Sequence, residues 1–237
     1  MSRGAVLRRP DGLPDWFEPL LTRVGECRSE DFTALRKPIG TAGRASAVLV
    51  LLGEDEPGRP DLLILQRAAT MRNHAGQPAF PGGATDPEDI DAAATALREA
   101  DEEVGLDQSS AEVLALLPDL WIPVSGFVVT PVLAWWRKPH QVHPLQATEV
   151  AHVDRLPISE LADPQNRIRV RHPSGWIGPA FQVRGLLVWG FTAGVIAALL
   201  DMAGWTIPWE PGRVVELPDA AAPVPAVRGG APDEVVP

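Results

Sequence analysis

The chain has 237 residues, of which 45% are hydrophobic, and its formal net charge is −10. This length and apolar content are enough to bury a substantial core and lie at the upper end of the size of one domain. The acidic balance argues against nucleic-acid binding, because proteins that bind nucleic acid usually display a basic face. The single cysteine, Cys27, cannot form an internal disulfide, and we expect it to be structural.

The composition suggests three successive regions. We expect an N-terminal extension over 1–40 with a short amphipathic helix at 16–24, a main domain over 41–205, and a Pro/Ala-rich, disordered tail over 206–237. Near the start, Pro10, Asp11 and Asp15 interrupt any apolar run of the kind that a signal peptide needs. The cytoplasm is therefore the expected location.

The main domain alternates strand and helix patterns. Hydrophobic periodicity predicts strands at 45–52 and 62–66 with a break at 54–60, then a helix that ends near 105. Further strands are expected at 111–117, 126–136 and 146–153, then a short helix at 159–162, a strand pair at 167–171 and 176–183, and an apolar helix at 185–200. That last segment is shorter than the roughly 20 residues that cross a bilayer, so we expect it to be buried. Mixed strands with helices on both sides predict an α+β fold, an α/β/α sandwich.

The helix that precedes Gly105 carries an apolar stripe on one side. The stripe consists of Ile90, Ala93, Ala94, Leu97, Ala100 and Val104, at steps of about three and four residues. Gly105 is the expected stop signal. For the start, Asp86 followed by Pro87 is one candidate N-cap and Asp89 is the other.

The opposite side of this helix is acidic. Glu99, Glu102 and Glu103 stand at positions i, i+3 and i+4, so their carboxylates project from one face within reach of each other. Such like charges repel, whereas Mg²⁺ or Mn²⁺ prefers oxygen ligands and would neutralise them. Arg98 lies one turn before Glu102 and is expected to pair with it as a scaffold.

An acidic helix face is more often simply solvated. Here the helix follows Phe80, Pro81, Gly82 and Gly83, a strand end that runs into a glycine turn where the backbone can approach a ligand closely. A glycine turn followed by this acidic helix favours metal-dependent phosphate chemistry.

These residues resemble the signature of the Nudix hydrolases, G-x5-E-x7-R-E-U-x-E-E-x-G-U, in which U is aliphatic. The second half matches from Arg98 to Leu106, with Ala100 where a bulkier aliphatic is usual. In the first half, Ile90 stands where the family has Glu, and Glu88, Asp89 and Asp91 flank it as candidates for the missing acid. The resemblance implies a Nudix-type sandwich and bound Mg²⁺ or Mn²⁺, with Glu99, Glu102 and Glu103 as metal ligands.

The segment 67–83, RAATMRNHAGQPAFPGG, is similar to the segment that precedes the Nudix signature in coenzyme A pyrophosphatases. The resemblance implies that coenzyme A is split into 3′,5′-ADP and 4′-phosphopantetheine. The candidate substrate-binding residues are Arg67, Arg72, His74, Gly82 and Gly83. Arginine forks suit a substrate with several phosphates, although a single arginine or a single histidine more often has a structural role.

The mechanism that we expect is attack of water on a phosphoanhydride, with Glu99, Glu102, Glu103 and Arg98 as the catalytic group. Glu149 is a weak candidate for a general base outside the box. A homodimer is a further expectation. Two alternatives stay open: hydrolysis of another nucleoside diphosphate compound, NADH-like or sugar-linked, and a nucleotide-binding module that has lost catalysis.

Overall fold

The computed structural model describes all residues except 1–2, 34, 36, 39–40, 72–74 and 218–237. Its largest element is a mixed sheet of nine strands. The long strands are β2 (Arg44–Glu56), β3 (Arg59–Arg67), β8 (Phe127–Trp136) and β9 (Val150–Pro157). The short strands are β1 (Ala5–Val6), β4 (Pro78–Ala79), β5 (Gly82–Ala84), β6 (Ala111–Leu116) and β7 (Leu120–Ile122).

Strand β2 is the centre of this sheet. It pairs in parallel with β8 and antiparallel with β3, and β9 adds to the other side of β3. The run from Ala47 to Leu52 is apolar without alternation because both faces of the sheet are covered. The predicted break at 54–60 is shorter in the structure, since β2 extends to Glu56 and β3 starts at Arg59.

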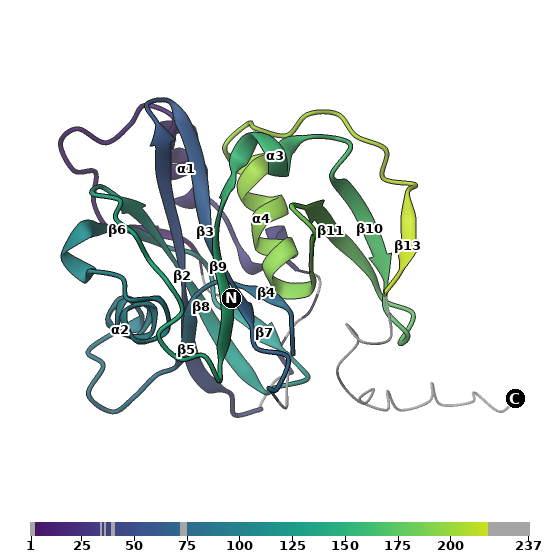
Figure 1. The fold of residues 1–237 in the computed structure, drawn as a ribbon, viewed down its shortest axis with the longest axis horizontal. Coiled ribbons are helices and arrows are strands. Elements are labelled where there is room, and N and C mark those ends of the chain that lie inside the picture. Colours follow the sequence, from purple (N-terminus) through teal and green to yellow (C-terminus); the bar gives the residue numbers. More distant parts are fainter. Residues whose placement is uncertain (1–2, 34, 36, 39–40, 72–74, 218–237) are drawn as a thin grey trace, which may run out of the picture.

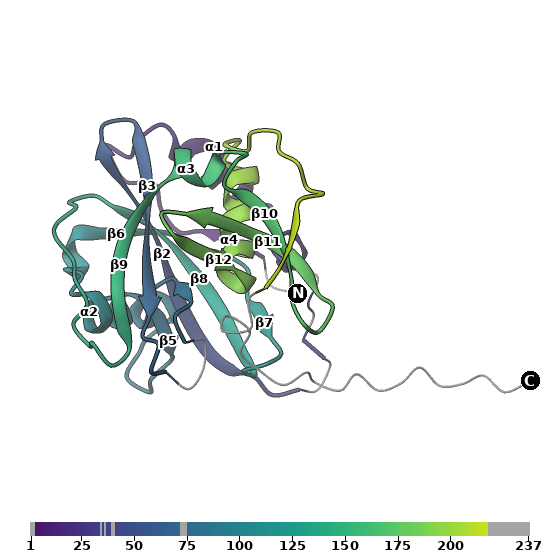
Figure 2. The ribbon, with the colours of Figure 1, turned by 45° about the vertical axis from the view of Figure 1, so that its right-hand side comes forward.

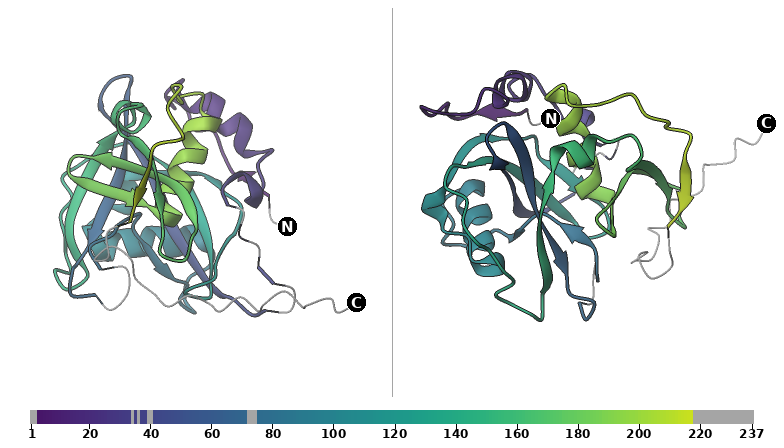
Figure 3. Two further views of the ribbon diagram at one scale, coloured as in Figure 1. Left: turned by 90° about the vertical axis from the view of Figure 1, so that its right-hand side faces the viewer. Right: turned by 45° about the horizontal axis from the view of Figure 1, so that its top comes forward.

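Helices cover both faces of the large sheet (Figures 1 and 3). Helix α2 (Ala92–Val104) packs on one face, where Ala96, Ala100 and Val104 join one apolar cluster. Helices α1 (Phe17–Val24) and α4 (Gly190–Met202) join the cluster on the other face, and α3 (Ile158–Ala162) follows β9. The predicted α+β sandwich with a mixed sheet is confirmed, as is the short N-terminal helix.

A second sheet of four strands lies beside α4 (Figure 2). It consists of β10 (Arg167–Arg171), β11 (Ile177–Val183), β12 (Leu186–Trp189) and β13 (Val214–Glu216), in the order β12-β11-β10-β13. The predicted strand pair is its central hairpin. The rest of this sheet was not expected from the sequence.

Two predictions about the C-terminal third are wrong. Residues 185–200 are not one helix: Arg184 and Gly185 have φ of 51° and 78° and form a two-residue turn, so the chain returns as β12 before α4 begins at Gly190. Within the tail over 206–237 that was predicted to be disordered, Val214–Glu216 instead forms β13 and pairs in parallel with β10. Residues 218–237 lie outside the described part.

Strand β9 begins four residues later than predicted. The amide N–H groups of Glu149 and Val150 both donate to the Gln146 carbonyl, so a turn occupies the expected strand start. Among the helices of the described residues, none has the length and apolar character required to cross a membrane.

Candidate active site

Helix α2 has well-defined ends. Its N-cap is Asp91, whose side chain accepts a hydrogen bond of 2.8 Å from the Ala94 N–H. Gly105 ends the helix in the left-handed conformation, with φ of 70°, and its N–H returns to the carbonyls of Ala100 and Asp101. The predicted stop is confirmed, whereas both predicted starts, Asp86 and Asp89, are wrong because the loop runs on to Asp91.

The position of Ile90 is a correction that follows from this start. It lies in the loop before the helix and is 90% exposed, so it does not belong to the apolar stripe. Its neighbour Asp89 points inward and has a side chain only 6% exposed.

Asp89 is the acid that engages Arg98. The Arg98 Nε donates to Asp89 Oδ1 and its Nη2 donates to Asp89 Oδ2, both at 3.0 Å, which is the two-pronged geometry of a strong arginine–carboxylate pair. The Thr95 hydroxyl and the Asp86 N–H also donate to Asp89. These hydrogen bonds, that of Arg98 above all, lower the pKa of Asp89 well below its usual range.

Arg98 also reaches the acidic face of the helix. Its Nη1 lies 3.1 Å from Glu99 Oε1 and 3.3 Å from Glu102 Oε2, so the expected pairing with Glu102 is present alongside ion pairs with Asp86, Asp89 and Glu99. Its Nη2 also donates to the Ala84 carbonyl at the end of β5. Arg98 therefore contacts the loop before α2, the end of β5 and two of the three glutamates.

Glu103 is the most buried of the three glutamates, with 4% of its surface exposed. One carboxylate oxygen accepts a hydrogen bond of 2.9 Å from the Gly82 N–H. Burial raises the pKa of Glu103 to about 7 despite that hydrogen bond, and the charges of Glu99 and Glu149 act in the same direction. Burial also raises the pKa of the half-buried Glu99, whereas Glu102 is exposed.

The two glycines before the helix fit closely against different neighbours. Gly82 has φ of 156°, and a Cβ there would lie 2.3 Å from the Ala47 carbonyl oxygen and 2.6 Å from the Val48 Cα. At Gly83 a Cβ would lie 2.3 Å from Glu99 Oε1. Gly82 therefore permits close backbone packing against β2, and Gly83 leaves the space that the Glu99 carboxylate occupies.

Arg67 and Glu149 complete the neighbourhood of Glu103. They stand at the adjacent ends of β3 and β9, where the Ala68 N–H donates to the Glu149 carbonyl at 2.7 Å. The Arg67 charge lowers the pKa of Glu103, and the Arg67 Nε is buried without a hydrogen-bond partner among the described residues. Arg72 and His74 lie outside the described residues.

Comparison with known proteins decides the family. A family model described as the NUDIX domain matches residues 43–174. The chain belongs to the Nudix family. It is 40% identical over 182 residues to an uncharacterized Nudix hydrolase, NudL, of Citrobacter koseri, which covers 73% of this chain and 91% of that protein.

Other Nudix proteins are similar over comparable lengths. NudL of Escherichia coli K12, also described as uncharacterized, is 37% identical over 169 residues, 68% of this chain and 83% of the relative. Among solved structures, a Nudix hydrolase from M. smegmatis, RenU, aligns with a TM-score of 0.48 and 20% identity over 71% of this chain and 91% of that one.

The side chains of this site are of the chemical type that binds a divalent metal. Glu99 and Glu103 are partly or fully buried carboxylates with raised pKa values, and buried like charges favour binding of a hard cation. In the described residues no three acidic, histidine or cysteine side chains are gathered closely enough to ligate one ion. Arg98 pairs with both Glu99 and Glu102. Glu99, Glu102 and Glu103 are the residues of α2 that could hold a metal.

The residue that the sequence pattern could not place is Asp89. It was one of three candidates for the missing acid, and its burial and its contacts with Arg98 and Thr95 distinguish it from the exposed Glu88 and Asp91. Thr95, which supports Asp89 from the first turn of the helix, was not identified from the sequence because a buried threonine has no spacing signal of its own.

One added methyl group is expected to have different effects at Gly82 and at Gly83. Gly82→Ala should lower the free energy of unfolding by about 2–4 kcal/mol, because its Cβ meets fixed backbone. Gly83→Ala should leave stability nearly unchanged but weaken Mn²⁺ binding, since it displaces only the end of a glutamate side chain. Urea unfolding and Mn²⁺ titration of both variants test this. Equal destabilisation of the two would contradict the assignment.

Asp89 should matter more than its neighbour Asp91. We expect Asp89→Asn to lower hydrolytic activity about 10- to 100-fold, because Arg98 loses its strongest partner and no longer holds the glutamates in place. The matched control is Asp91→Asn, which removes one charge two positions away and keeps a good N-cap. Initial rates under identical metal concentrations provide the measurement, and equal activity of the two variants would rule out the role of Asp89.

Proposed function

We propose that this Nudix hydrolase cleaves coenzyme A or a derivative at the pyrophosphate and releases 3′,5′-ADP and 4′-phosphopantetheine. The family assignment supports the coarser activity, hydrolysis of a nucleoside diphosphate derivative. The finer substrate rests on the segment 67–83 and its similarity to the coenzyme A pyrophosphatases.

The observation that carries the proposal is the position of this segment. It starts at Arg67, beside Glu103, and ends at Gly82 and Gly83, which contact Glu103 and Glu99. Both described ends of this segment thus lie beside the glutamates of α2. A segment so placed is suited to hold the phosphates of the substrate while the glutamates face the bond that breaks.

Each residue has a distinct part in the proposed reaction. Arg67, half-buried beside Glu103, is the proposed phosphate ligand, and its positive charge offsets the negative charge of the diphosphate. Glu99 and Glu103 hold Mg²⁺ or Mn²⁺, which when bound makes water more acidic and stabilises charge on the phosphate oxygens. Glu149, half-buried and close enough to Glu103 to raise its pKa, is the proposed acceptor of the proton from water.

Two other functions fit parts of the site. Another nucleoside diphosphate compound would meet the same glutamates, since they act on the diphosphate and not on the flanking groups. A binding module without catalysis was suggested by the missing acid at Ile90. The pairing of Asp89 with Arg98 provides an acid at that place and favours the enzyme.

Turnover of coenzyme A tests the proposal. With Mg²⁺ or Mn²⁺ the native chain should release 3′,5′-ADP, and Glu103→Gln should lower kcat about 100-fold because a neutral amide holds the metal less well. Asp101→Asn is the matched control, as it removes a charge from an exposed position of the same helix. Product release is followed by chromatography beside a panel of other nucleoside diphosphates.

The outcomes separate the candidates. Cleavage of another panel member with no release from coenzyme A would reject the proposed substrate and keep the Nudix reaction. Binding of nucleotides without turnover of any panel member would favour the non-catalytic module.

A further inference from the structure

The second sheet has an apolar face that points away from α4. Phe181, Val183 and Val188 belong to the core cluster shared with α4, whereas the alternating residues Ile168, Val170 and Ala180 form, together with Leu217, a separate buried cluster. Leu187 and Trp189 of β12 pack against this separate cluster. The sheet therefore buries one face on the helix and gathers apolar groups on the other.

Aromatic rings collect at one end of that face. His172 and Trp189 lie with ring centroids 6.0 Å apart and planes at 28°, a stacked pair. Trp176 lies over Gly178, because a Cβ at Gly178 would meet its indole at 2.0 Å. Trp176 is 39% exposed, which is unusual for so large an apolar side chain. We call His172, Trp176 and Trp189 the aromatic platform.

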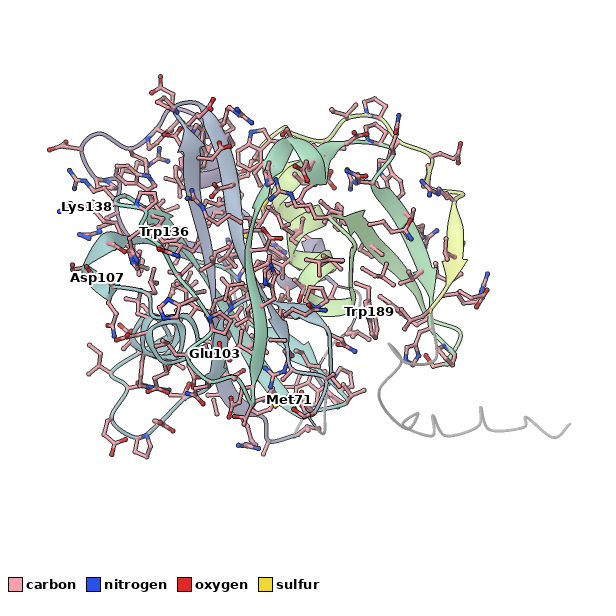
Figure 4. All side chains as sticks on the ribbon, viewed as in Figure 1. Met71, Glu103, Asp107, Trp136, Lys138 and Trp189 are labelled. Atoms are coloured by element: carbon pink, nitrogen blue, oxygen red, sulfur yellow. The ribbon has the colours of Figure 1, made fainter. Side chains whose placement is uncertain are left out.

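The platform is linked to the candidate active site through α4 and β4. Trp189 is followed by α4, whose Thr192 hydroxyl donates to the Pro78 carbonyl in β4 at 3.2 Å. From Pro78 the chain reaches Gly82, the hydrogen-bond partner of Glu103, in four residues, a span of at most about 14 Å. Figure 4 labels Glu103, on α2, and Trp189, at the end of β12.

Most of the platform lies C-terminal to the residues that match the Nudix family model. The family match ends at residue 174, so Trp176 and Trp189 follow it. The Nudix signature accounts for the chemistry at the diphosphate. Specificity for the groups that flank the diphosphate arises in elements added to the common fold. The exposed indole of Trp176, beside the half-buried Trp189, suits a flat ring more than a further phosphate.

We propose that the aromatic platform binds the nucleobase of the substrate, a purine, by stacking against Trp189 and Trp176. The inference rests on the proposed function insofar as it places the diphosphate at Glu99 and Glu103. The inference adds that the nucleobase end of the substrate lies toward the second sheet. It also assigns base recognition to residues outside the Nudix signature.

Binding of adenosine 5′-monophosphate in EDTA tests the platform without any turnover. Ribose 5-phosphate, which has the same sugar and phosphate but no base, is the matched ligand. By calorimetry the native chain should bind the nucleotide at least about fivefold more tightly than ribose 5-phosphate, as expected for one stacked base. Trp189→Ala and Trp176→Ala should abolish that preference, and Trp189→Phe should restore most of it.

Trp209→Ala is the control variant. Trp209 is a half-buried tryptophan that lies over Arg167, 4.7 Å from ring centroid to guanidinium, and belongs to no part of the platform. It should keep the native preference for the nucleotide. Equal affinity of the native chain for both ligands, or an unchanged preference in Trp189→Ala and Trp176→Ala, would overturn the inference.

The same variants separate this inference from the proposed function. If the native chain hydrolyses coenzyme A and the platform variants leave the KM unchanged, the platform is not the base site and the reaction stands. If the native chain prefers the nucleotide through the platform but hydrolyses no diphosphate, the base site stands and the proposed reaction fails.

Discussion

The hydrogen bond from the Gly82 N–H to the buried carboxylate of Glu103 is the contact on which the site depends. It fixes the last turn of α2 against the glycine turn, and it leaves an acidic side chain where water is largely excluded. Burial disfavours the charged form of Glu103 and raises its pKa to about 7. A carboxylate kept in such a place is suited to a positively charged partner, which in this family is a divalent metal.

The other contacts of the site follow from the same arrangement. Gly83 makes room for Glu99 only because the turn is held close to the helix, and Arg98 secures the loop from the opposite side through Asp89. Arg67 and Glu149 reach Glu103 because β3 and β9 end side by side. The chemistry thus depends on the junction of a strand, a glycine turn and a helix.

The sequence was most informative where local rules decide the structure. The acidic helix, its stop at Gly105 and the central strands follow from periodicity and from the left-handed preference of glycine. The predicted helix start was wrong because Asp86, Asp89 and Asp91 are all good N-caps in isolation. Asp89 does not cap the helix because its carboxylate accepts hydrogen bonds from Arg98 and Thr95, which lie further along the chain. The second sheet was missed because β12 is as apolar as the helix that follows it, and β13 is held by pairing with a strand more than 40 residues earlier.

The most direct test of the buried glutamate is the pH dependence of metal binding. Mn²⁺ must displace the proton that Glu103 holds below pH 7, so affinity in the native chain should rise about 30-fold between pH 5.5 and pH 8. In Glu103→Gln, which keeps the hydrogen bond to Gly82 but has no proton to lose, binding should be weaker and much less dependent on pH. A native affinity that does not change over this range, or an equally steep rise in Glu103→Gln, would contradict the account.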